Sequence, residues 1–158
     1  TLKDWADHLT TIFPEVRLKR YLEMRGADSG PWRRLCALPA FWAGILYEQS
    51  SLDAAWDMVK GWSAQERQAL RDAVPRQGLK AQIAGRSVRE IAAEALVLAR
   101  SGLSARGLTG CKGRPEASFL DVLDETVASG MTAADNLLEL YHGAWKGDVS
   151  RVFRDFAY

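Results

Sequence analysis

The stretch VRLKRYLEMR, residues 16–25, carries charged side chains at alternate positions and is the first candidate for a functional site. If it is a β-strand, one face holds Arg17, Lys19, Tyr21, Glu23 and Arg25. A carboxylate close to several cations can hold a divalent metal while the cations bind phosphate oxygens. The simpler interpretation is a solvent-facing strand with cross-strand ion pairs. Alternation alone favours that simpler interpretation, because charged residues are usually exposed.

The turn and helix start that follow, GADSGPWRR at residues 26–34, form a second candidate. The glycines permit unusual backbone angles, and the backbone N–H groups of such a turn can contact an anion. Trp32, Arg33 and Arg34 begin the helix expected next. Arginines in a first helical turn oppose the helix dipole but are often simply exposed, so this signal is weak by itself. No Walker A, GxGxxG or GxSxG pattern occurs elsewhere in the sequence.

The composition limits the classes of function. The chain has 158 residues, a net charge of +1 and a hydrophobic fraction of 47%, which fits one ordinary globular domain. A charge so close to neutral gives no general reason to expect nucleic acid or an anionic membrane surface as a partner. No apolar run is long enough to span a bilayer. Cys36 and Cys111 lack metal-ligand spacing, and such sparse cysteine predicts a reducing, cytoplasmic setting.

The predicted fold class is mainly α, with one or two strands. A single strand over residues 16–25 cannot satisfy its own backbone hydrogen bonds, and the only other strand candidate, residues 76–85, is weak. The missing sheet is therefore expected from chain outside these residues. The lack of an initiator Met points the same way, and residues 1–158 are expected to be a single helical segment of a larger protein.

Capping residues and glycines predict where the helices begin and end. Two capping boxes, formed by Ser63 with Glu66 and by Ser87 with Glu90, are each expected to begin a helix. Ser51 and Thr132 are each expected to begin a helix as single capping residues. Residues 104–117 contain three glycines and a proline, which predicts a flexible surface loop. Six tryptophans are many for this length, and most are expected to be core or interface anchors.

Two long motifs carry a resemblance to a known family. RYLEMRGAD at residues 20–28, followed by GPWRRLCALPAFW at residues 30–42, closely resembles the plant and proteobacterial type of glutamate–cysteine ligase. Weaker similarity extends over nearly the whole chain, which resembles the carboxy-terminal portion of that enzyme. The resemblance implies a glutamine-synthetase-like fold, in which the strand at 16–25 belongs to an antiparallel sheet that forms the floor of the active site.

The resemblance also implies an activity and residue roles. The activity is ATP-dependent ligation of L-glutamate to L-cysteine, with Mg²⁺ bridging the phosphates and the missing amino-terminal part of the enzyme completing the site. Glu23 would be a magnesium ligand, and Arg25 would contact the phosphoryl group or the glutamate carboxylate. Supporting roles in phosphate or substrate binding fall to Arg17, Lys19, Trp32, Arg33, Arg34 and Tyr47. The alternative is a helical interaction or regulatory module without chemistry of its own.

Overall fold

The chain divides into two compact units in the computed structural model, which describes residues 1–28, 30–110 and 113–157. The smaller unit is Thr1–Gly30 and the larger is Pro31–Tyr158. Parts of the turn at 26–34 and of the loop at 104–117 lie outside the described residues, namely Ser29, Cys111 and Lys112.

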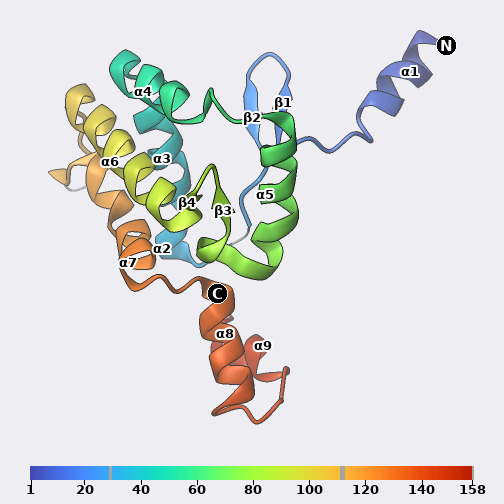
Figure 1. Ribbon diagram of the computed structural model, residues 1–158, viewed down its shortest axis with the longest axis vertical. Coiled ribbons are helices and arrows are strands. Elements are labelled where there is room, and N and C mark those ends of the chain that lie inside the picture. The colour runs from blue at the N-terminus through green and yellow to red at the C-terminus, as the bar shows by residue number, and fades with distance from the viewer. Residues whose placement is uncertain (29, 111–112, 158) are drawn as a thin grey trace. The chain divides into compact units, whose positions relative to one another are not determined.

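The smaller unit contains one helix and one hairpin (Figure 1). Helix α1, Leu2–Leu9, begins with a capping box between Thr1 and Asp4. Strands β1, Val16–Leu18, and β2, Leu22–Met24, pair antiparallel. None of the described residues of this unit is buried, so the unit has no hydrophobic core of its own.

The stretch expected as one strand is therefore a two-stranded hairpin, and the prediction of a single strand over residues 16–25 is wrong. The chain reverses over residues 19–21, where the Lys19 N–H donates to the carbonyl of Tyr21 at 2.9 Å. The sequence KRY hides this reversal, because it contains none of the residues that favour hairpin turns. The pairing sets Arg17 opposite Glu23, so the predicted common face is kept.

The larger unit is mainly helical, with one further small hairpin (Figure 1). Its elements in chain order are α2 (Trp32–Leu35), α3 (Ala37–Leu46), α4 (Gln49–Val59), α5 (Ala64–Gln77), η1 (Gly78–Lys80), β3 (Gln82–Ile83), β4 (Arg86–Ser87), α6 (Val88–Arg106), η3 (Glu116–Leu120), α7 (Asp121–Ser129), α8 (Ala133–His142) and α9 (Arg151–Asp155). The weak strand candidate at 76–85 thus contributes β3, which pairs with β4. Among the described residues, no helix combines the length and apolar character that a membrane crossing requires.

The core of the larger unit lies where α3, α6 and η3 pack together. Its buried side chains are Ala40, Ile45, Leu96, Ala99, Leu103 and Leu120. Helices α3 and α6 approach closely because glycine lies on both sides of the crossing. A Cβ atom on Gly44 would collide with the backbone of Ala99, and one on Gly102 would collide with the backbone carbonyl of Gly44. The Ser51 hydroxyl of α4 donates to the Leu98 carbonyl of α6 at 3.0 Å at the same place.

Most of the predicted helix starts are confirmed. Ser63, Ser87 and Thr132 cap α5, α6 and α8, each with an acidic residue completing a capping box. Ser51 is different, because α4 begins at Gln49 with Glu48 as its N-cap. Helix α6 continues through Arg106, and Thr109 forms a β-bridge with Pro115. Regular structure therefore occupies part of the segment expected as a loop at 104–117.

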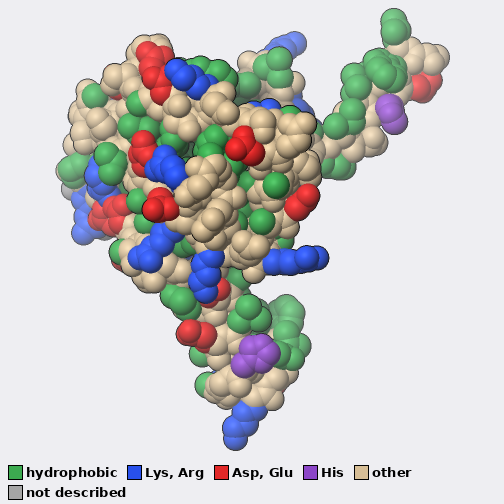
Figure 2. All heavy atoms as spheres, viewed as in Figure 1, with side chains coloured by type: hydrophobic (Ala, Val, Ile, Leu, Met, Phe, Trp, Pro, Cys, Tyr) green, Lys and Arg blue, Asp and Glu red, His purple; other side chains and the backbone are tan. Residues whose placement is uncertain are grey.

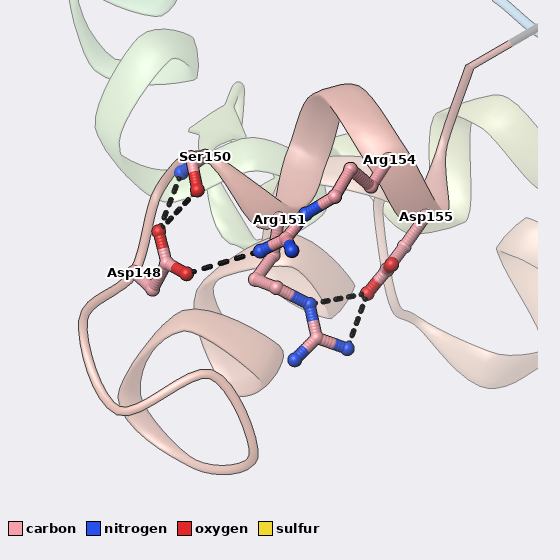
Figure 3. A network of polar contacts seen from close by, with 5 residues as sticks. All are labelled: Asp148, Ser150, Arg151, Arg154 and Asp155. Carbon is pink, nitrogen blue, oxygen red and sulfur yellow. Dashed lines mark hydrogen bonds and ion pairs between the residues drawn. The ribbon is translucent and has the colours of Figure 1, made fainter.

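The end of the chain is held by local polar contacts (Figure 3). The carboxylate of Asp148 accepts hydrogen bonds from the N–H and hydroxyl of Ser150 at 3.0 and 2.5 Å, and it pairs with Arg154 at 3.2 Å. Arg151 pairs with Asp155 one turn along α9 at 2.9 Å. These bonds lower the pKa of Asp148, chiefly through the Ser150 hydroxyl. They hold the segment from Asp148 to Ser150 against α9, which has no side-chain cap at its N-cap residue Ser150.

The capping carboxylate of Glu48 gives a pH-dependent prediction. Hydrogen bonds, first from the Ser50 side chain and then from backbone N–H groups including that of Ser51, lower its pKa from 4.5 to about 2. Because the pKa of Glu48 is lower in the folded state, its ionised carboxylate contributes its full stabilisation above pH 4.5. This contribution is lost as the pH falls towards about 2 and the carboxylate is protonated. We expect Glu48→Gln to lower the melting temperature at neutral pH, and the difference from the parent protein to shrink across that window. The exposed Glu139→Gln is the control, and a pH-independent difference would contradict the prediction.

Candidate functional site

Three side chains meet on one face of the β1–β2 hairpin. Because Arg17 and Glu23 are directly paired across the strands, their side chains emerge on the same face, and Arg25 emerges there two residues after Glu23. The Glu23 Oε2 atom lies 3.2 Å from Nη1 of Arg25 and 3.6 Å from Nε of Arg17. All three side chains are half-buried, at 20–31% exposure. The sequence prediction that these residues share a face is confirmed.

An aromatic ring supports the two arginines. The guanidinium carbons of Arg25 and Arg17 lie 5.3 and 6.0 Å from the centre of the Phe13 ring, which is within cation–π range. Phe13 precedes Pro14 in the segment that leads into β1. We call Phe13, Arg17, Glu23 and Arg25 the hairpin cluster. Phe13 was not a predicted site residue, and its position before the alternating stretch was the only signal available in the sequence.

The cluster keeps Glu23 ionised. The hydrogen bond from Arg25 lowers the pKa of this carboxyl group, and the charges of Lys19, Arg25 and Arg17 lower it further, while partial desolvation opposes them. Lys19 lies in the turn and is exposed, so it acts on Glu23 through its charge. Glu23 therefore stays an anion below the pH at which an ordinary glutamate is protonated.

The balance of charge in the hairpin cluster favours an anionic ligand. One carboxylate faces two guanidinium groups, with the ammonium group of Lys19 close enough to influence it. The Nε atom of Arg17 is shielded from solvent and has no hydrogen-bond partner among the described residues. Each guanidinium carries five N–H donors in a planar fork, which matches phosphate and carboxylate oxygens. The guanidinium N–H groups that do not face Glu23 are therefore chemically suited to an oxyanion.

A magnesium ion fits this site under one condition. Among the described residues, no group of three or more His, Cys, Asp and Glu side chains is placed to hold a metal. Glu23 contributes one carboxylate, and the surrounding cations would repel a bare divalent ion. Magnesium commonly binds proteins through one or two carboxylates together with substrate phosphates. Glu23 therefore fits as a ligand to a magnesium ion that arrives with phosphate.

The other predicted site residues belong to the larger unit. Trp32 on α2 is highly exposed, and its neighbour Arg33 forms an ion pair with Glu125 of α7. Arg34 is half-buried and has no side-chain hydrogen bond or ion pair among the described residues. Arg33 and Arg34 line an open hollow of about 300 Å³ between α2, α7 and the start of α8. The remaining lining residues are Pro31, Val122, Glu125, Thr126, Ser129, Met131 and Asn136.

Tyr47 lies away from this hollow, at the C-terminal end of α3. Its ring is exposed and lies 5.4 Å from the guanidinium carbon of Arg106, at the end of α6. Arg106 also pairs with Glu116 at 3.9 Å. The structure thus assigns Tyr47 a partner in its own unit, which the sequence could not indicate because Arg106 is 59 positions away (106 minus 47).

Comparisons with known proteins connect these features to a family. The model of glutamate–cysteine ligase family 2 (GCS2) matches residues 1–155. The chloroplastic glutamate–cysteine ligases of Nicotiana tabacum and Medicago truncatula are each 53% identical to the chain over all 158 residues. The Arabidopsis thaliana enzyme is 52% identical over 155 residues, or 98% of the chain. The chain spans only 28–30% of the length of these relatives.

These relatives also correct the expected location. Their names place them in the chloroplast, so the prediction of a cytoplasmic setting is wrong. The error has a physical origin, because a cysteine count bears on redox conditions and not on which compartment encloses a protein. The family model matches nearly the whole chain, and relatives from several plants share about half of its residues. These two findings together establish family membership. The chain belongs to glutamate–cysteine ligase family 2.

Proposed function

We propose that this chain forms one wall of the active site of a glutamate–cysteine ligase. In this reaction a γ-carboxylate oxygen of L-glutamate attacks the γ-phosphorus of ATP, ADP leaves and γ-glutamyl phosphate forms. The amine of L-cysteine then attacks the acyl carbon, loses a proton and displaces phosphate. The product is γ-glutamylcysteine, formed in the first step of glutathione synthesis. The relatives' names support the ligase activity, and the hairpin cluster supports a place for this chain in the chemistry.

The arrangement of Arg17, Glu23 and Arg25 is the observation that carries this proposal. Phosphoryl transfer spreads negative charge over the oxygens of the transferred group, so the protein contributes mainly positioning and electrostatic stabilisation. Arg25, fixed by Glu23 and Phe13, would contact the transferred phosphoryl group or the glutamate carboxylate. Arg17 and Lys19 would add positive charge on the same side. Fixed guanidinium groups need little rearrangement at the moment of reaction.

Magnesium has a defined place in this proposal. Glu23 would hold the ion together with phosphate oxygens of ATP, because a glutamate carboxylate offers the hard oxygen ligands that magnesium prefers. When bound, the ion would neutralise part of the negative charge of the phosphates. Arg25 and Arg17 would keep Glu23 ionised and oriented towards it.

The remaining substrate contacts are proposed for the larger unit. Trp32 and Arg34 have no ion pair or side-chain hydrogen bond among the described residues, so both are available to a substrate. Arg33 and Tyr47 would have to exchange or share their partners, Glu125 and Arg106. The hollow beside α2 supports a pocket role for Arg34 most directly.

We infer that the hairpin extends into a larger antiparallel sheet. A two-stranded hairpin is marginally stable by itself, and an uncovered apolar face makes it less so. The apolar face of this hairpin exposes Val16, Leu18 and Leu22. Strands from the rest of the ligase would cover this face or pair with its edges, as we expect if the whole enzyme has the glutamine-synthetase-like fold that the sequence resemblance implies.

The activity is tested by comparing the longer ligase with this chain alone. We expect the longer enzyme to form γ-glutamylcysteine with release of one phosphate per product, in a reaction that needs ATP, L-glutamate and L-cysteine. We expect the 158-residue chain to show no steady phosphate release under the same conditions, because one carboxylate and two guanidiniums cannot assemble a nucleotide site. Steady ATP- and glutamate-dependent release by the chain alone would overturn this view. Failure of the longer enzyme to form the dipeptide would overturn the proposed function.

A further inference from the structure

Helix α1 presents an apolar face that nothing in its own unit covers. Leu2, Trp5 and Leu9 are spaced three and four residues apart and so lie on one side of the helix. All three are exposed, Trp5 at 59%, and Figure 2 shows hydrophobic side chains along much of the helix. The opposite side carries Lys3 and Asp7. This pattern is typical of a helix that packs against a partner surface.

The smaller unit as a whole needs such a partner. A helix of eight residues is marginal in water, since most helical stability in proteins comes from packing an apolar face. No described residue from Thr1 to Asp28 is buried, so neither α1 nor the hairpin provides that packing to the other. Ile12 and Phe13, which follow α1 in the chain, are also exposed, at 53% and 71%.

Phe13 lies four residues after Leu9, the last residue of α1, and belongs to the hairpin cluster. One part of its ring supports the guanidiniums of Arg17 and Arg25, while most of its surface remains open. A surface that covered Leu2, Trp5, Leu9 and Phe13 would therefore also restrict the two arginines.

We propose that this face, defined by Leu2, Trp5, Leu9 and Phe13, docks onto the portion of the ligase outside these 158 residues. The relatives provide the occupant, because about 70% of their length lies outside the region matched by this chain. The polar residues of α1 argue against a membrane surface, since interfacial helices are rich in lysine and arginine and α1 has two aspartates and one lysine. The proposal deepens the proposed function and rests on it: docking holds Phe13, and Phe13 holds Arg17 and Arg25.

A photo-crosslink in the longer ligase tests which surface covers α1. Trp5 is replaced by p-benzoylphenylalanine, and the crosslinked peptide is identified by mass spectrometry. The expected partner peptide comes from outside the 158 residues and from the same molecule. A crosslink to residues 31–157, a crosslink to a second copy, or the absence of any crosslink would each overturn the proposal. The readout does not depend on activity, so it remains interpretable if the proposed function fails.

Hydrogen exchange provides a second measurement on the same protein. In the longer ligase, Trp5→Ser should speed exchange of the amides of residues 2–9 by about tenfold or more, because local opening is no longer opposed by packing. Lys3→Ala, on the opposite side of the helix, should leave exchange unchanged. Equal exchange in both variants and the parent enzyme would show that the face is not a docking surface.

Discussion

Glu23→Gln in the longer ligase is expected to reduce kcat by about a hundredfold or more and to raise the magnesium concentration needed for half-maximal rate. The amide removes the negative charge that would hold the metal and leaves the guanidiniums of Arg17 and Arg25 without their shared counter-ion. Loss of one preorganised electrostatic contact to a reacting group commonly costs a factor of this size. Steady-state rates measured across a magnesium titration give both quantities.

The matched control is Asp7→Asn, which makes the same carboxylate-to-amide change on the polar side of α1. It should leave the rate and the magnesium response unchanged. Glu23→Gln should keep the circular dichroism spectrum of the parent enzyme, because ion pairs that solvent partly reaches contribute little to stability. Normal turnover with a normal magnesium response in Glu23→Gln would show that the metal role is wrong.

Gly102→Ala is expected to lower the free energy of unfolding by about 3 kcal/mol, at the upper end of the usual cost of overpacking a core. The added Cβ would collide with the Gly44 carbonyl and would meet the Ser51 hydroxyl at 3.0 Å. A backbone carbonyl inside a helix cannot rotate away, so α3 and α6 must separate. Their separation would disturb the core around Leu103. This cost outweighs the gain of about 1 kcal/mol from the higher helix propensity of alanine.

Gly61→Ala is the control for this substitution, because no atom lies within 4 Å of the position that its Cβ would occupy. It should change stability by less than about 0.5 kcal/mol, as surface substitutions usually do. Urea denaturation followed by far-ultraviolet circular dichroism compares the two variants with the parent protein. Equal midpoints for Gly102→Ala and Gly61→Ala would contradict the close helix crossing.

Local signals in the sequence predicted the helices well. The capping boxes at Ser63, Ser87 and Thr132 mark the starts of α5, α6 and α8, because a cap depends only on residues within one turn. Ser51 shows the limit of such signals. Its hydroxyl donates a hydrogen bond to the Leu98 carbonyl of α6, and Glu48 is the N-cap residue of α4 instead. The residue that caps a helix therefore depends partly on whether the other possible capping residues form hydrogen bonds elsewhere in the fold.

The candidate site was predicted in part for the same reason. Alternation along residues 16–25 correctly placed Arg17, Glu23 and Arg25 on one face, since the side-chain period of two holds in a single strand and in this hairpin. The turn at residues 19–21 was missed, because its residues carry no turn preference. The contribution of Phe13 was also missed, since the approach of its ring to both arginines depends on the path of the chain between α1 and β1.

Motifs and neighbours within a few positions were enough to predict the family, the mainly helical class, most helix starts and the shared face of the charged hairpin. Other features depend on how distant segments pack. Of the six tryptophans, all within the described residues, Trp145 alone is buried, at 5% exposure, while Trp5, Trp32 and Trp56 are exposed. Only the fold brings Arg106 to Tyr47 and Glu125 to Arg33. Contacts between distant positions depend on how the helices pack, which local pattern does not encode.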